Sequence, residues 1–371
     1  MTRTELSEMI ALAERLASID EPAVLSTLFS SRGSTYRPLG AMMVSGPPPM
    51  LAGGVSGGCL EQYIARHGRS LTEEHAAAIL SFDADPDAED RGRPVLGCGG
   101  AIEVLVERFT PEHLAFLKQI HAAHCGDSFS TAACILDTSR PSSIHVRRMW
   151  IAQRARVTNG AALERLLWQS VAQQQSRFGE LDSQRRALIH YIRPLTRLVI
   201  FGAGDDVRPL CTLASSVGWH VTIADRRARL ATQSRFPDAD DVIAYDWASA
   251  VEQIVFTPNT AIVMMTHSLP DDIEILPLLI NKKFAYIGAL GPAHRRRWLL
   301  EGVEKTTPLP EEFSARIRGP IGLNLGDRTA MGIAVSIVAE ILADLNGRTP
   351  SRLSSDEKKE NLRNEELVPN G

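Results

Sequence analysis

The sequence predicts an α/β protein: an N-terminal α+β domain followed by a C-terminal Rossmann-like, doubly wound parallel sheet. With 371 residues, the chain exceeds the usual size of one domain. Short apolar runs bounded by Gly or Pro fill its first third, whereas beyond residue 197 strand-like runs alternate with helical segments. We therefore assign residues 1–115 to the N-terminal domain, 116–194 to a connecting region of mixed strands and helices, 195–345 to the Rossmann-like domain and 346–371 to a polar, disordered tail.

The composition and charge of the chain argue against a nucleic-acid-binding protein and against a membrane protein. Hydrophobic residues make up 44% and charged residues 23% of the chain, with a formal net charge of −4. This charge is too small to support nucleic-acid binding through phosphate neutralisation. The apolar stretches are shorter than the roughly 20 residues that cross a bilayer, and the N-terminus lacks the apolar core of a signal peptide. We expect a cytoplasmic homo-oligomer that binds neither nucleic acid nor membrane.

The N-terminal domain opens with apolar side chains at helical spacing, which predict a helix over Thr4–Ala17. Strands are predicted over Ala23–Phe29 and Ala41–Ser45. The polar connection between them contains Arg32, Ser34 and Arg37. Hydroxyl groups, backbone amides and guanidinium groups of such a loop bind anions, although the same composition also suits a solvated hairpin end.

Two cysteines flanked by glycines are the main candidates for chemistry. Cys59 lies in the segment Gly53–Glu61, and Cys98 lies in Gly97–Gly100. Glycine removes side-chain bulk, so a ligand can approach both the sulfur and the neighbouring amides. A helix predicted over Leu60–Arg69 would place its N-terminus beside Cys59, where it stabilises a thiolate or a phosphate. The candidate residues of these two elements are Cys59, Cys98, Ser56, Gly57, Gly58, Gly97 and Gly99.

Each of these elements alone also fits a buried cysteine beside a strand-connecting turn. Their occurrence together in one domain favours a site. The five cysteines of the chain do not form a disulfide framework, and their spacing gives little support to a closed zinc site. The remaining segments before the Rossmann-like domain predict a strand, a helix, two strands and a helix, at Ala101–Glu107, Pro111–Ala123, Ala132–Leu136, Ile144–Trp150 and Leu163–Val171.

The Rossmann-like domain begins with a strand–turn–helix–strand unit. A buried-strand run ends at Phe201, the turn Gly202-Ala203-Gly204 follows, and the next strand ends at Asp225, which is 21 positions after Gly204. That is close to the spacing at which a carboxylate meets an adenosine ribose. Gly202, Gly204 and Asp225 are therefore candidate nucleotide contacts, but Val207 stands where the third glycine of the fingerprint would be.

Arg226 and Arg227 would suit a 2′-phosphate, so the sequence leaves the form of nucleotide open. Later strands are predicted over Asp241–Tyr245, Ala261–Met265 and Phe284–Ile287. His267 follows the second of them, at the strand end where ligands of such sheets bind, and is both a candidate ligand residue and a candidate hydrogen-bonded loop residue.

These elements, in this order, resemble the XdhC/CoxI family, the accessory factors of molybdenum hydroxylases such as xanthine dehydrogenase and carbon monoxide dehydrogenase. The resemblance covers both ends of the chain, and two segments depart from it. Gly291-Pro292-Ala293-His294 stands where the family usually shows Gly-Ser-Arg, and Thr329-Ala330-Met331-Gly332 stands where it usually shows Thr-Pro-Glu-Glu. The segments that carry the resemblance are Arg32–Ala41, Gly54–Glu61, Gly97–Gly100, Gly202–Gly204, Ala224–Arg227, Arg235–Pro237, Met265–His267, Tyr286–Gly291 and Pro320–Leu323.

The resemblance implies an accessory factor that binds the molybdenum cofactor, as molybdopterin or its dinucleotide form. It further implies help in exchanging the oxo ligand for a sulfido group, with a cysteine desulfurase as sulfur source, and insertion of the cofactor into an apo molybdenum hydroxylase. Arg32 or Arg37 would hold the phosphate, and Cys59 or Cys98 would accept a persulfide or lie next to the soft metal. Such a protein is a cofactor-handling chaperone more than a turnover enzyme.

Two other functions remain open at this stage. An NAD(P)-dependent oxidoreductase would use the Rossmann-like domain, with His267 and Asp272 as acid–base candidates. The incomplete glycine fingerprint and the lack of an evident substrate motif disfavour it. A regulatory nucleotide-binding module with structural cysteines is the third possibility.

Overall fold

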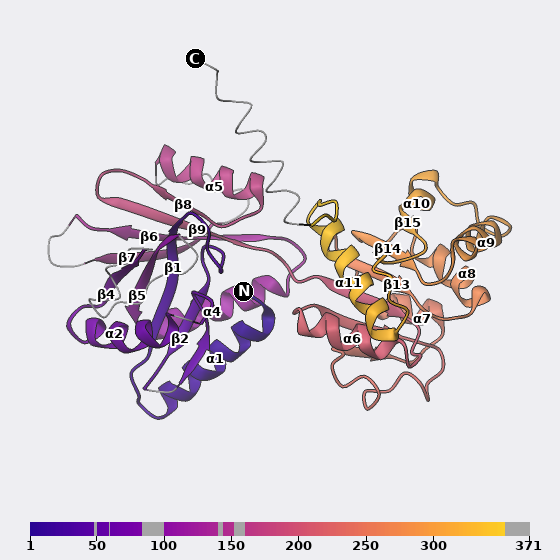
Figure 1. Ribbon diagram of the computed structural model, residues 1–371, viewed down its shortest axis with the longest axis horizontal. Coiled ribbons are helices and arrows are strands. Elements are labelled where there is room, and N and C mark those ends of the chain that lie inside the picture. Colours follow the sequence, from indigo (N-terminus) through magenta and orange to yellow (C-terminus); the bar gives the residue numbers. More distant parts are fainter. Residues whose placement is uncertain (48–49, 59, 84–99, 140–143, 152–159, 353–371) are drawn as a thin grey trace, which may run out of the picture. The chain divides into compact units, whose positions relative to one another are not determined.

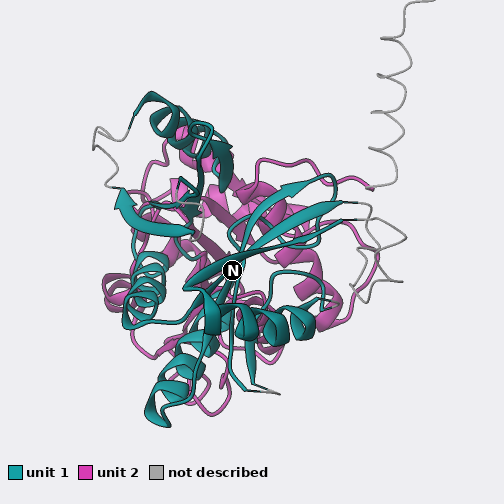
Figure 2. Ribbon diagram, turned by 90° about the vertical axis from the view of Figure 1, so that its left-hand side faces the viewer, with its two compact units in different colours: residues 1–195 teal, residues 196–371 magenta. Residues whose placement is uncertain are grey.

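The computed structural model describes residues 1–47, 50–58, 60–83, 100–139, 144–151 and 160–352 (Figure 1). The chain forms two compact units, Met1–Leu195 and Thr196–Gly371, which are coloured separately in Figure 2. Residues 116–194 thus lie in the same unit as residues 1–115. Cys59, Gly97, Cys98 and Gly99 lie outside the described residues.

Two antiparallel sheets form the framework of the first unit. The five-stranded sheet has the order β3-β2-β1-β5-β4 and the four-stranded sheet the order β7-β6-β9-β8. The strands are β1 (Val24–Arg32), β2 (Met42–Ser45), β3 (Leu51–Gly53), β4 (Ala77–Phe82), β5 (Ala101–Arg108), β6 (Ser130–Asp137), β7 (His145–Ile151), β8 (Arg177–Glu180) and β9 (Arg185–Ile192).

Four described helices cover this framework: α1 (Arg3–Ser18), α2 (Glu61–Glu74), α4 (Pro111–His124) and α5 (Ala161–Gln173). Phe29 and Leu105 of the first sheet share a buried cluster with Leu136 and Leu188 of the second, so the sheets pack face to face. Helix α2 packs on the other side of the five-stranded sheet, and α5 packs on the other side of the four-stranded sheet.

The described part of the connecting region contains more regular secondary structure than its sequence indicates. Its strands pair with each other as one sheet, in which β9 is a central strand. Strand β9 was not predicted because it starts with the charged pair Arg185-Arg186, which hides the apolar run behind it. The edge strand β8 was also not predicted, and it contains Gly179, which is unfavourable in strands.

The second unit is a six-stranded, fully parallel sheet in the order β12-β11-β10-β13-β14-β15. The predicted doubly wound sheet is confirmed, with its change of winding direction between β10 and β13. The strands are β10 (Arg197–Phe201), β11 (His220–Ala224), β12 (Asp241–Ile243), β13 (Thr260–Met264), β14 (Tyr286–Ala289) and β15 (Ile317–Arg318). The helices are α6 (Val207–Ser216), α7 (Trp247–Gln253), α8 (Leu269–Leu278), α9 (Ala293–Glu304), α10 (Glu311–Arg316) and α11 (Ala330–Leu345).

The alternation of side chains along β10 shows how both faces of this sheet are buried. Leu198 and Ile200 pack with α6 and α11, whereas Val199 and Phe201 pack with α7, α8 and α9. Among the described residues, no helix combines the length and the apolar character needed to span a bilayer.

Candidate functional site

The glycine-rich loop before α2 is organised by the carboxylate of Glu61, the first residue of that helix. Its Oε1 accepts hydrogen bonds from the backbone amides of Val55 (3.1 Å) and Ser56 (2.8 Å), and its Oε2 accepts one from Ser56 Oγ (2.7 Å). Glu61 is only 8% exposed. Burial acts to raise the pKa of this carboxyl group, but the hydrogen bonds from Ser56 and Val55 outweigh it and hold the pKa below its ordinary value.

Several backbone amides of this loop are already hydrogen-bonded and are not free to bind a ligand. Two donors of the predicted anion-binding loop, the amides of Val55 and Ser56, are already bonded to Glu61. The hydroxyl of Ser56 in turn accepts hydrogen bonds from the amides of Gly58 and Leu60, both at 3.3 Å. The loop is therefore held in shape by its own chain, including the residues on both sides of Cys59.

The arginine-containing loop after β1 lies against the glycine-rich loop. A Cβ added to Gly57 would lie 3.3 Å from the ring of Tyr36, which is 79% exposed. A Cβ on Gly54 would lie 3.5 Å from the Arg37 guanidinium. These distances place Tyr36 and Arg37 in direct contact with the backbone of the glycine-rich loop.

The second glycine–cysteine element reaches the same loop from the other side. Ala101 of β5 pairs with Arg32 of β1, so the preceding Gly100 meets the turn after β1. A Cβ on Gly100 would overlap the Ser34 carbonyl oxygen and lie 3.0 Å from that of Arg32. The structure thus brings together Arg32, Ser34 and Arg37 with Ser56, Gly57, Gly58 and Gly100. The positions of Cys59, Gly97, Cys98 and Gly99 lie outside the described residues, and their roles stay predictions.

The two arginines of this site differ in their partners. Arg37 donates to Glu5 of α1 at 2.6 Å and is half-buried. The same Glu5 completes the N-terminal cap of α1 by accepting the amide of Thr2 at 2.9 Å. Arg32 is exposed, and its side chain makes no hydrogen bond or ion pair within the described part of the chain. Of the two arginines, Arg32 is the one without a hydrogen-bonded partner in the described residues, and its charge is among those that lower the pKa of Glu103.

Two of the three described cysteines, Cys134 and Cys211, are buried. Burial raises the pKa of Cys134 and of Cys211 to about 12, so both are neutral thiols at physiological pH and poor nucleophiles. Cys125 is exposed at the end of α4. The described residues contain no cluster of three or more His, Cys, Asp or Glu side chains that would hold a metal ion.

In the second unit, the predicted nucleotide contacts are engaged within the protein. Asp225 is 1% exposed, and its carboxylate accepts hydrogen bonds from the Ala203 amide (2.8 Å), the Arg227 amide (2.9 Å) and the Arg227 guanidinium (2.6 Å). Burial acts to raise its pKa, but these bonds outweigh burial and lower it. The neighbouring Arg226 pairs with Asp271 at 2.6 Å.

Two carboxylates follow the glycine turn at the start of α6. Asp205 pairs with Arg235 and Asp206 with His267, both at 2.8 Å. Negative charges here neutralise the partial positive charge with which a helix N-terminus holds a pyrophosphate. Acidic side chains at this position oppose the binding of a pyrophosphate, and each of the two already has a partner within the protein.

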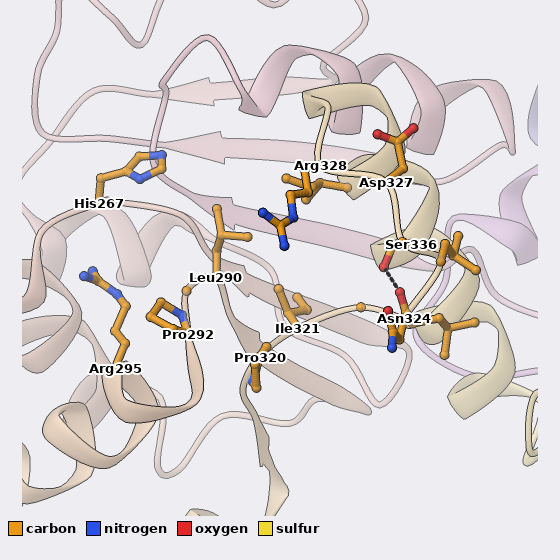
Figure 3. Close-up of a pocket in the computed structure, with 16 residues that line it drawn as sticks. His267, Leu290, Pro292, Arg295, Pro320, Ile321, Asn324, Asp327, Arg328 and Ser336 are labelled. Carbon is orange, nitrogen blue, oxygen red and sulfur yellow. Dashed lines mark hydrogen bonds between the residues drawn. The ribbon is translucent and has the colours of Figure 1, made fainter.

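A cavity of about 890 Å³ lies in the second unit, beyond the carboxyl ends of β13 and β14 (Figure 3). His267, half exposed and with a left-handed backbone (φ 60°), borders it. Arg295 also lines it and is bonded to the buried Asp272 at 2.6 Å. Burial raises the pKa of Asp272, against the lowering effect of Thr266 and Arg295.

Comparison with known proteins defines the family. A model of the XdhC and CoxI family matches residues 16–83, and a model of the XdhC Rossmann domain matches residues 198–341. The chain belongs to the XdhC and CoxI family. This membership confirms the resemblance found in the sequence, and it covers both units.

Several relatives of this XdhC/CoxI protein span most of its length. A Bacillus subtilis protein, named as a probable subunit of xanthine dehydrogenase, is 29% identical over 89% of this chain and 96% of its own. The Escherichia coli molybdenum cofactor insertion chaperone PaoD is 26% identical over 86% of this chain and 82% of its own. A crystal structure described as a xanthine dehydrogenase from Bacillus halodurans is 28% identical, with a TM-score of 0.72 over 94% of this chain and 97% of that one.

The sequence did not predict three features of these two candidate sites: the Glu61 carboxylate inside the loop, the acidic pair Asp205-Asp206 and the cavity residue Arg328. Glu61 was visible as an acid that begins a helix directly after a glycine-rich loop. The acidic pair was visible in the sequence directly after Gly204. Arg328 carried no local signal, because its site forms only when distant segments meet.

Proposed function

We propose that this chain is a maturation factor that binds the molybdenum cofactor and inserts it into an apo molybdenum hydroxylase of the xanthine dehydrogenase class. The observation that carries the proposal is the meeting of the Arg32–Arg37 loop, the glycine-rich loop before Cys59 and Gly100 after Cys98 in one place. Similarity to a molybdenum cofactor insertion chaperone over 86% of the chain supports it.

The residues of this site suit the cofactor as cargo. Molybdopterin carries a phosphate, for which the exposed guanidinium of Arg32 and the hydroxyl of Ser34 are the natural contacts. Its metal is soft enough to favour thiolate neighbours, the role proposed for Cys59 and Cys98. Arg37 positions the loop against α1, because its guanidinium is bonded to Glu5.

Sulfuration is the finer part of the same proposal. A cysteine desulfurase would supply the sulfur as a persulfide while the cofactor is held here. A thiol reductant, such as excess cysteine, would provide the two electrons that convert this sulfur to the sulfido ligand, and the oxo ligand would leave as water. If so, loaded protein prepared without the desulfurase carries pterin but leaves the client hydroxylase inactive. Addition of the desulfurase and cysteine before transfer should restore client activity. Full client activity without any desulfurase would contradict this part of the proposal.

The cargo is tested by purification from a molybdate-replete host, acid–iodine oxidation and fluorescence detection of the pterin product. We expect at least about one pterin per chain, because the first unit offers one site for it. Replacement of Cys59 or Cys98 by Ala should lower this ratio, whereas Cys125→Ala, a change at an exposed thiol on α4, should leave it unchanged. Wild-type protein without pterin would contradict the proposal.

An NAD(P)-dependent oxidoreductase is the second candidate function, and the acidic pair after Gly204 and the engaged Asp225 disfavour it. Equilibrium dialysis against NAD and NADP, compared with the pterin content, separates the two functions. A regulatory nucleotide-binding module would instead retain its activity in a Cys59→Ser, Cys98→Ser double variant, which the cofactor-handling function forbids.

A further inference from the structure

We infer that the cavity of the second unit binds an organic phosphate that carries a planar heterocycle, and that Arg328 contacts its phosphate group. The inference rests on the proposed function for its ligand class, because both molybdopterin and a nucleotide have this chemistry. It concerns the half of the parallel sheet opposite to the Gly202-Ala203-Gly204 turn.

The position of the cavity is the first argument. It is bordered by His267 after β13 and by Leu290 and Gly291 after β14, next to the switch between β10 and β13. Ligands of open parallel sheets bind beyond the carboxyl ends of the strands, at such a switch. The volume of about 890 Å³ falls in the range of sites for small organic ligands.

The distribution of charge is the second argument. The Arg295 guanidinium is paired with Asp272, and His267 is paired with Asp206. The carboxylate of Asp327 accepts the amide of Thr329 at 2.7 Å. Arg328 makes no side-chain hydrogen bond or ion pair within the described residues, and Figure 3 shows its guanidinium group directed toward Leu290 and Ile321. This free cation marks where the anionic part of a ligand would bind.

The walls of the cavity supply the third argument. Polar side chains of the lining besides Arg328 are those of His267, Arg295, Asn324, Asp327 and Ser336, and Ser336 is bonded to the Leu323 carbonyl. The apolar side chains of the lining are Leu290, Pro292, Pro320, Ile321, Leu323, Leu325 and Ile333. The amides of Gly322 and Leu323 are already bonded to Glu340 (2.7 Å) and to the Ser336 carbonyl (3.2 Å). An apolar wall beside one free guanidinium suits a ring with a phosphate attached, and it does not suit a small inorganic anion.

The site is tested by calorimetric titration of the full chain with 5′-AMP, 5′-CMP, 5′-GMP and inorganic pyrophosphate. At least one nucleotide should bind more tightly than pyrophosphate. Arg328→Gln should weaken that binding about tenfold or more, the effect of losing a charge-assisted contact. Arg328→Lys should restore part of it, because the charge remains but the planar fork is lost. Arg229→Gln, at an exposed arginine outside the cavity, is the matched control and should bind as wild type does.

A second measurement on the same preparations identifies the source of the phosphate. Binding of a nucleotide that depends on Arg328 indicates a nucleotide or the nucleotide half of a dinucleotide cofactor. A lower pterin content in Arg328→Gln without nucleotide binding to wild type indicates the phosphate of molybdopterin itself. Each result supports the inference, provided that the thermal unfolding midpoint of Arg328→Gln equals that of wild type.

The inference is overturned if Arg328→Gln keeps both the nucleotide affinity and the pterin content of wild type. That result leaves the proposed function standing, because wild type would still carry pterin. If wild type carries no pterin, the proposed function fails, but the nucleotide titration still tests whether the cavity binds an organic phosphate. Failure to bind any of the probes, together with an unchanged pterin content in Arg328→Gln, also overturns the inference.

Discussion

At the scale of single residues, Glu61 acts as an internal anion. Its carboxylate takes the backbone donors that a glycine-rich loop would otherwise offer to a phosphate. The loop before Cys59 is therefore preorganised, which lowers the conformational entropy that binding has to overcome. The proposed phosphate contacts of this site are then side chains, namely those of the exposed Arg32 and Ser34.

Replacing Glu61 by Gln should destabilise the first unit by about 1.5–3 kcal/mol, because the loop loses a charged acceptor for its buried donors. Urea unfolding at pH 7 measures this change in the free energy of unfolding. Glu73→Gln, in the same helix but exposed, is the matched control and should change it by less than about 0.5 kcal/mol. Equal effects of the two substitutions would show that Glu61 does not organise the loop.

The buried carboxylate of Glu107 should make the stability of the first unit depend on pH in the acidic range. Burial acts to raise its pKa, but the hydrogen bond and charge of Arg148, with His113, lower it from 4.5 to about 2. A lowered pKa adds stability that is complete above pH 4.5 and is lost as the pH falls through about 2, here about 3 kcal/mol. Urea unfolding between pH 7 and pH 2 should show this loss.

Glu107→Gln should remove most of that pH dependence. At pH 7 it should also cost about 3–5 kcal/mol, because Arg148 would stay buried without its partner. Glu112→Gln, an exposed position on α4, should retain the acid response of wild type. An unchanged acid response in Glu107→Gln would exclude this carboxylate as its source.

At the scale of elements, the strand–turn–helix unit at residues 197–216 has the secondary structure that the sequence predicts, but contacts within the protein explain its first glycine. Gly202 has φ 124° and packs so closely on the end of β13 that a Cβ would overlap the Met265 carbonyl oxygen. This explains the glycine by packing within the protein, without a ligand. The acidic pair Asp205-Asp206 at the start of α6 is bonded to Arg235 and His267, and its negative charge opposes an anionic ligand at this helix N-terminus.

Gly202→Ala should therefore destabilise the second unit more than backbone strain alone does. Gly326 is the matched control, since it also has a positive φ (80°) but no atom within 4 Å of an added Cβ. We expect a cost of about 1 kcal/mol for Gly326→Ala. We expect at least about 2 kcal/mol more for Gly202→Ala, since the main chain of β13 has to move. Thermal unfolding measures both losses of stability. Similar losses for Gly202→Ala and Gly326→Ala would show that the contact of residue 202 with the Met265 carbonyl adds no cost.

Periodicity predicted the elements whose burial is regular, such as α1, α4 and the parallel strands β10, β11 and β13. It failed for β9 and β8, where a charged start and a glycine obscure the pattern. The meeting of the Arg32 loop with Gly100 depends on the antiparallel pairing of β1 with β5, and the contact of Gly57 is with Tyr36 of the same loop. Sequence order alone does not contain that pairing, so the resemblance predicted the participants of this site and not their contacts.

At the scale of the whole molecule, the two units offer different chemistry. The first gathers the loops next to the glycine-flanked cysteines, and the second holds a cavity with a free guanidinium. The proposed cofactor site of the first unit and the proposed phosphate contact of the second are therefore tested separately, by variants of Cys59 or Cys98 and of Arg328. On this account the chain carries the cofactor and does not consume it.

The most direct test of this account is transfer of the cofactor. Pterin-loaded protein is mixed with the apo form of a xanthine dehydrogenase-class hydroxylase, the two are separated, and both pterin content and hydroxylase activity are measured. The account predicts that the pterin lost by this chain appears in equal amount on the hydroxylase. The hydroxylase becomes active once the cofactor is sulfurated. Retention of the pterin on this chain, with a hydroxylase that stays empty, would contradict it.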